Sequence, residues 1–161
     1  MAELGLGVVP RAEVIPLPAW TEMLAVVLAP LSFTVIMRAR AVDALPILGV
    51  CVLAFFGGRA GSAALGPELG VFAGAFVAAL ASNLHARWRG LPVLVTLSPA
   101  LMLLVPGSVG FRSIALMMDR EVLDGIQAAF RMTIMFAALV AGLQVAGAAV
   151  PAPRLGSPSR S

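Results

Sequence analysis

The chain has 161 residues, of which 60% are hydrophobic and 12% are charged, and its formal net charge is +3. An average soluble domain has about 25% charged residues, so this composition excludes a soluble fold, and the high hydrophobicity excludes an intrinsically disordered chain. We therefore expect an integral membrane protein with a single domain. All the basic residues are arginines in short clusters between apolar runs, which is typical of membrane loops and not of a nucleic-acid-binding face.

Residues 1–19 contain three prolines and no signal-peptide pattern, so we expect an irregular lead-in there. The first apolar run covers residues 23–37. A helix of that length is roughly 22 Å long, shorter than the ~30 Å hydrocarbon core, but Trp20 and Arg38 can extend it into the interfaces. Pro30, in its middle, is expected to kink it.

Four further apolar runs follow the first, and each is apolar on all faces, which favours membrane helices over barrel strands. The sequence therefore predicts an all-α polytopic membrane helix bundle over residues 20–150. It has five apolar segments, four to five transmembrane helices and a fourth segment broken by Pro-Gly. Residues 151–161 are rich in proline and serine and are expected to be a disordered tail. The four runs cover residues 44–58, 69–84, 90–111 and 132–153, the last beginning near Asp124.

The distribution of arginines predicts the orientation in the membrane. With five crossings, the loops at 38–43 and 85–90 share a side with the C-terminal tail and carry six arginines, against four on the other side. This asymmetry favours an external N-terminus and a cytoplasmic C-terminus. The six are Arg38, Arg40, Arg87, Arg89, Arg154 and Arg160, and the four are Arg11, Arg59, Arg112 and Arg120.

Two stripes of small residues at a spacing of four predict close helix packing, with each other or with a partner chain, because small residues let membrane helices approach closely. The first consists of Gly66, Gly70, Gly74, Ala78 and Ser82, and the second of Gly125, Ala129, Thr133, Ala137 and Ala141.

The fourth segment contains the strongest candidate for a substrate pathway. Proline and glycine inside an apolar run release backbone polar groups at membrane depth, which is tolerated only where protein or a water-filled cavity satisfies them. Broken helices of this kind present backbone groups to substrates in transporters. The alternative is that Pro106-Gly107 is only the turn that ends a helix at the interface. The candidate residues are Thr96, Ser98, Pro99, Pro106, Gly107 and Ser108.

Three other features carry alternative interpretations. Arg131 lies inside the last segment, where a charge is a functional candidate, or it snorkels or pairs with Asp124. Residues 57–62 form a Gly-rich stretch around Arg59 that is able to approach an anion or is a flexible loop. Asn83 and His85 are expected to cap a helix at the interface, although histidine can also relay protons.

The sequence offers no support for catalysis. One cysteine and one histidine are too few for a Cys- or His-based metal site, and there is no Gly-x-Ser-x-Gly elbow. We expect no metal, no cofactor and no enzymatic activity.

Residues 20–150 resemble the C-terminal membrane half of the threonine/serine exporter (ThrE) family. The likeness is strongest at Pro99, at Leu-Leu-Val-Pro106-Gly107 and at the aromatic–arginine pair Phe111-Arg112 three residues later. Residues 57–59, the Gly/Ala-rich third segment and the run 142–146 are also similar. The family often has tyrosine where Phe111 stands.

The resemblance implies a multi-pass protein of the bacterial inner membrane that exports small amino acids such as threonine and serine, or related small carboxylates, using the proton gradient. Arg112 or Arg131 would then bind the substrate carboxylate. It also implies a larger partner subunit carrying the N-terminal half of the exporter, or a homo-oligomer. The alternative is a structural subunit that packs against a transporter without contacting the substrate.

Overall fold

The structure, a computed structural model, describes residues 18–105 and 122–152. All regular structure in these two ranges is helical, as the sequence predicts. The elements are α1 (Ala19–Ile36), the short 3-10 helix η1 (Ala41–Asp43), α2 (Ala44–Leu65), α3 (Pro67–Arg89), α4 (Leu94–Leu104) and α6 (Val122–Ala149).

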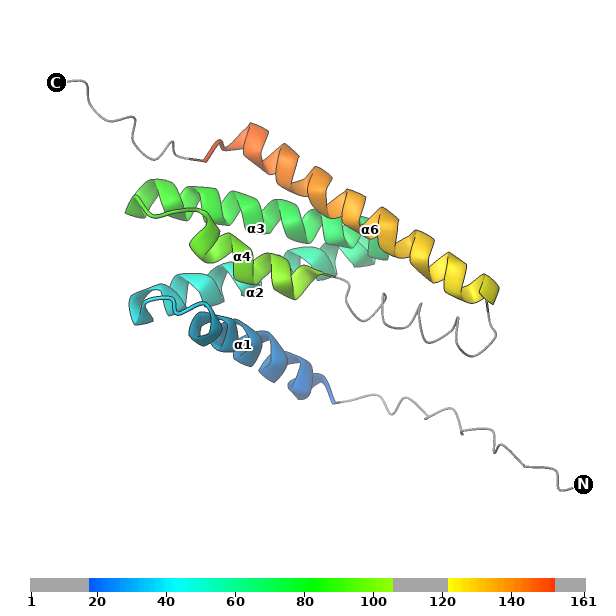
Figure 1. Cartoon of the computed structure of the whole chain (residues 1–161), viewed down its shortest axis with the longest axis horizontal. Helices are drawn as coiled ribbons and strands as arrows, with labels where there is room; N and C mark the ends of the chain where they lie inside the picture. Colours follow the sequence, from blue (N-terminus) through cyan, green and yellow to red (C-terminus); the bar gives the residue numbers. More distant parts are fainter. Residues whose placement is uncertain (1–17, 106–121, 153–161) are drawn as a thin grey trace, which may run out of the picture.

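The helices α2 and α3 form an antiparallel hairpin at the centre of the bundle (Figure 1). α1 packs on α2, α4 packs on both α2 and α3, and α6 packs on α3. The arginine-bearing loops and the end of α6 lie at one end of the bundle, which we call the arginine end. There the Arg87 side chain donates through Nη2 to the carbonyl oxygen of Pro151 at 2.8 Å. The α2–α3 turn at Gly66 lies at the opposite end, which we call the turn end.

Glycines allow α2 and α3 to approach until their backbones touch. A Cβ atom on Gly61 would lie 2.5 Å from the Cβ of Ala73, and one on Gly70 would lie 2.8 Å from the carbonyl oxygen of Gly58. Gly66 has a φ of 93° at the turn, a value that glycine adopts without steric cost. The first predicted stripe therefore lies between the two helices from Gly70 to Ser82, with Gly66 at the turn before α3.

The Gly-rich stretch at residues 57–62 is helical, so the expectation of a flexible loop there is wrong. α2 continues through it to Leu65. Glycine lowers helix stability in water by about 1 kcal/mol relative to alanine, but a bilayer offers no other partner to the backbone polar groups. Here the small residues also provide the contact with α3, which compensates for their low helix propensity.

The helix α6 packs on α3 through a face that differs from the predicted small-residue stripe. Residues four apart rotate by about 40° per step around a helix, whereas alternating steps of three and four stay on one seam. Thr133, Ala137 and Ala141 are consequently exposed in this chain, and Gly125 and Ala129 are more covered. The seam that contacts α3 consists of Met135, Leu139, Gly142 and Ala146, all buried.

Polar side chains at the arginine end fasten α6 to α3. The Asn83 amide Nδ2 donates to the carbonyl oxygen of Val150 at 2.7 Å, and the Arg87 guanidinium donates to that of Pro151. These carbonyls belong to the end of α6, where helical donors run out. Asn83 thus caps the end of the neighbouring helix α6, whereas the Nε2 atom of His85, the other predicted cap, has no partner among the described residues.

Three helices in the described ranges are long and apolar enough to cross a membrane, in the ranges Ala41–Leu65, Pro67–Arg89 and Gly125–Ala149. The apolar parts of α1 and α4 are shorter. Trp20 is 63% exposed at the start of α1 and Trp88 is 80% exposed at the arginine end, positions typical of side chains at the two membrane interfaces. The predicted all-helical architecture is confirmed. The number of helices that cross the bilayer stays a prediction.

We predict that Gly142→Ala loosens α6 from α3, because the new Cβ would lie 2.5 Å from the backbone oxygen of Phe72. Overpacking of this kind costs about 1–3 kcal/mol. Gly147→Ala is the matched control on the same helix, since nothing lies within 4 Å of its Cβ position. Thermal unfolding of the purified protein in detergent should show a lower Tm for Gly142→Ala and an unchanged or higher Tm for Gly147→Ala. Equal Tm values would contradict the described contact.

Candidate functional site

The helix of the fourth apolar segment, α4, ends at Leu104, two residues before Pro106. α4 spans 11 residues, about 16 Å at 1.5 Å per residue, which is roughly half of the ~30 Å hydrocarbon core. Val105 is extended, with φ −62° and ψ 124°, the conformation that a following proline favours. The helix thus ends where the sequence predicts a break.

The charged residues of α3 indicate how deep in the membrane this helix end lies. Glu68 and Arg87 bracket an uncharged stretch that is about 28 Å long as a helix, close to the thickness of the hydrocarbon core. The Leu104 side chain lies over Gly74, whose Cβ position is 2.7 Å from Leu104 Cδ2. Gly74 is six residues after Glu68, about 9 Å along the helix axis. By this measure α4 ends inside the apolar zone, near the turn end.

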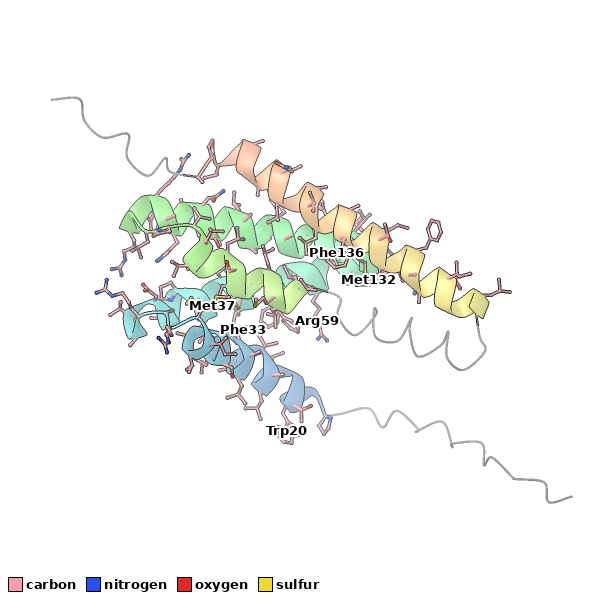
Figure 2. All side chains as sticks on the ribbon, viewed as in Figure 1. Trp20, Phe33, Met37, Arg59, Met132 and Phe136 are labelled. Carbon is pink, nitrogen blue, oxygen red and sulfur yellow. The ribbon has the colours of Figure 1, made fainter. Side chains whose placement is uncertain are left out.

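A hollow of ≈ 290 Å³ lies beside this helix end, between α2, α3 and α4. Figure 2 shows the Arg59 side chain projecting from α2 beside the end of α4. Arg59 and Ser62 supply the polar side chains of the hollow. The residues that line it are Phe55, Gly58, Arg59, Ser62, Gly70, Val71, Leu103 and Leu104.

The close contact of α2 and α3 brings Arg59 to this depth. Gly58 lies against Gly70 and Gly74 of α3, so the next residue is level with the first two turns of that helix. An arginine inside the apolar zone is expensive and marks a functional position by default. A guanidinium binds a carboxylate through paired hydrogen bonds, and the Ser62 hydroxyl provides a further donor and acceptor.

The predicted residues of α4 that the structure describes pack inside the bundle rather than in this hollow. Thr96 is 3% exposed and its hydroxyl donates weakly, at 3.4 Å, to the carbonyl oxygen of Val93. Pro99 is fully buried and Ser98 is partly buried. Because Pro99 has no N–H, the Val95 carbonyl lacks its usual helical donor.

Four of the predicted pathway residues, Pro106, Gly107, Ser108 and Arg112, lie outside the described residues. Their assignment to the pathway stays a prediction. Leu104, the last residue of α4, lines the hollow and precedes Pro106 by two positions in the sequence.

Arg131 does not line the hollow and forms an ion pair with Glu68, whereas the sequence suggests Asp124 as its partner. Its Nε atom is 3.3 Å from Glu68 Oε1 at the turn end, where α6 and α3 begin. The two side chains are 55% and 32% exposed. The parallel packing of α3 and α6 brings the two side chains together. Their positions in the sequence, 63 residues apart, do not predict this ion pair.

Sequence reasoning missed Arg59 and Ser62 as site residues, although it noted that a Gly-rich stretch around Arg59 is able to approach an anion. The available signal was the small-residue pattern of Gly57, Gly58, Gly61 and Ser62. That pattern is typical of a helix packed closely on another helix.

Comparison with known proteins gives one family. The model of the family described as "Threonine/Serine exporter, ThrE" matches residues 22–149. No curated protein matches the chain, and no solved structure matches it.

We predict that the Arg131–Glu68 pair adds little to stability, because exposed ion pairs are worth about 0–1 kcal/mol. A double-mutant cycle with Arg131→Gln and Glu68→Gln, measured by denaturation in detergent, should give a coupling energy below ~1 kcal/mol. A much larger coupling would show that this pair, at the turn end, is screened from water and has a role beyond that of a surface pair.

Proposed function

Because the chain belongs to the threonine/serine exporter family, we propose that it is a membrane subunit of a secondary exporter of small amino acids, or of related small carboxylates, that uses the proton gradient. The observation that carries this proposal is the end of α4 at Leu104, at membrane depth, beside a hollow that contains Arg59. A water-accessible substrate site requires polar groups at such a depth.

We assign Arg59 the role of binding the substrate carboxylate in the hollow. A carboxylate is anionic and arginine is cationic at neutral pH, and a site shielded from water strengthens their attraction. Ser62 is positioned on the same wall to contact the hydroxyl or ammonium group of a small amino acid. The predicted pathway would continue from this hollow through Pro106, Gly107, Ser108 and Arg112.

The remaining parts of the proposal concern the setting of this subunit. We propose that the chain lies in the bacterial inner membrane with a cytoplasmic C-terminus. The gathering of two arginine-bearing loops at one end of the bundle supports this orientation. A larger partner subunit or a second copy would complete the exporter. The exposed part of the α6 stripe, Thr133, Ala137 and Ala141, is a surface on which another helix can pack closely.

The same exposed stripe favours the alternative of a structural subunit that packs against a transporter. The two functions differ in their dependence on the hollow. A structural subunit would tolerate changes at Arg59 that leave the fold intact, whereas a subunit that lines the pathway would not.

We predict that Arg59→Ala lowers export of threonine by roughly 10- to 100-fold, the effect of losing the ~1.5–3 kcal/mol of a hydrogen bond to a charged group. Arg59→Lys should have a smaller effect, because lysine keeps the charge but loses the paired geometry. The measurement is efflux of labelled threonine from preloaded cells that express each variant together with any partner subunit.

Arg131→Ala is the comparison variant. The sequence also predicts Arg131 as a carboxylate ligand, but Arg131 pairs with Glu68 and does not line the hollow, so we expect this variant to keep near-normal efflux. Amounts of each variant in the membrane are compared by immunoblot. Normal efflux with Arg59→Ala at wild-type amounts would remove Arg59 from the site and favour the structural alternative.

A further inference from the structure

A second cleft opens at the arginine end of the bundle, far from the hollow at the turn end. Its volume is ≈ 430 Å³, within the roughly 300–1,000 Å³ typical of small-molecule sites. The lining residues come from the α1–α2 connection, the start of α2, the end of α3 and the segment that follows it. They are Arg40, Val42, Asp43, Pro46, His85, Arg89 and Leu91.

Two tight turns gather these charged side chains. After α1, the chain reverses through Arg38, which has a φ of 50°, and enters the short helix η1, where Asp43 is 8% exposed. After α3, Gly90 adopts a left-handed conformation with φ 65°, which ends the helix directly after Arg89. Both turns lie at the arginine end, so the cleft between them is charged.

The charged side chains of the cleft are not paired with one another. Within residues 18–105 and 122–152, no ion pair joins Asp43 to Arg40 or Arg89. Asp43 also makes no side-chain capping hydrogen bond to the start of α2. A largely buried carboxylate without a partner is unfavourable, so a cationic group that enters the cleft gains by pairing with it.

His85 gives the cleft a further polar group. It lines both the charged cleft and an apolar groove that Leu53, Leu84 and Trp88 help to line. The Nε2 atom is enclosed and has no hydrogen-bond partner among the described residues. Buried polar atoms without partners are uncommon in folded proteins, so His85 carries an unsatisfied hydrogen-bonding atom beside the cleft.

From this arrangement we propose that the arginine-end cleft is a second substrate site, which binds a small α-amino acid as a zwitterion. Arg40 and Arg89 hold the carboxylate, and Asp43 holds the ammonium group. The inference rests on the proposed function, and it assigns the cleft to the loading side of the exporter, opposite the hollow at Arg59. Arginines alone would suit any anion, including a lipid phosphate, but Asp43 repels a simple anion and selects for a ligand that also carries a positive charge.

The test compares threonine with 3-hydroxybutyrate, which has the same carboxylate and hydroxyl but no ammonium group. The full chain, with any partner subunit, is purified in a detergent free of phospholipid, and the Kd of each ligand is measured by isothermal titration calorimetry. The wild-type protein should bind threonine at least tenfold more tightly than 3-hydroxybutyrate. In an Arg59→Ala background, which removes carboxylate binding in the hollow, Asp43→Asn should abolish this preference, whereas Arg40→Gln should weaken the binding of both ligands.

Arg38→Gln is the matched control, because Arg38 belongs to the same loop but does not line the cleft. Since the readout is a ratio of two ligands, a partial loss of folded protein does not alter it, and Arg89→Gln provides a second test if Asp43→Asn fails to fold. Arg89→Gln, like Arg40→Gln, should weaken the binding of both ligands. Wild-type threonine preference in Asp43→Asn, or wild-type Kd values for both ligands in Arg89→Gln, would overturn the assignment of the cleft and fit a lipid headgroup there. Efflux that still depends on Arg59 would then leave the proposed function standing, whereas the absence of threonine efflux from wild-type cells would contradict both.

Discussion

The backbone contact between α2 and α3 determines the rest of the bundle. In a bilayer, apolar side chains gain little by leaving lipid for protein, so helices associate where small residues let their backbones approach. Gly58, Gly61, Gly70 and Gly74 provide this approach at the turn end. The contact has two consequences: it places Arg59 beside α3 at membrane depth, and it creates the surface on which the end of α4 rests.

The two cavities lie at opposite ends of the hairpin of α2 and α3, and a packed core lies between them. The hollow at Arg59 involves the end of α2 and the start of α3, whereas the cleft at Asp43 involves the start of α2 and the end of α3. Most of the residues between the two cavities have small side chains, so little side-chain volume blocks the path from one cavity to the other. The buried cluster consists of Ile47, Val50, Cys51, Ala54, Ala78 and Ala100. A transporter that alternates access between two sides needs such a barrier, together with helices that can shift against each other.

Much of this fold follows from hydrophobicity alone. The apolar runs predict the helices and their order, and the arginine clusters predict which loops share an end, because both signals are local. The length of α2 does not follow from a local signal. On their own Gly57 and Gly58 favour a loop, but their contact with α3 allows the helix to continue to Leu65. The face of α6 is also non-local: a spacing of four suggests Thr133 and Ala137, but the helix packs through Met135 and Leu139 on a 3.5-residue repeat.

The candidate site was harder to predict than the fold, for a related reason. Sequence reasoning found the break before Pro106 because proline and glycine act on their own backbone. It did not find that Glu68 is the partner of Arg131, or that Arg40, Asp43 and His85 line one cleft, because residues far apart in the chain meet there. The parallel packing of α3 with α6 brings Glu68 next to Arg131. The antiparallel packing of α2 with α3 brings Asp43 and His85 to the same cleft.

The central claim, that α4 ends beside a water-accessible hollow within the membrane, is tested most directly by the reactivity of cysteines at matched depth. In a Cys51→Ala background, Leu104→Cys lines the hollow, whereas Phe56→Cys lies on the exposed face of α2, less than one turn from Gly58. In membranes, a charged, water-soluble thiol reagent should modify the cysteine at position 104 much faster than the one at position 56. Equal, slow modification at both positions would show that the end of α4 is dry and would contradict the account.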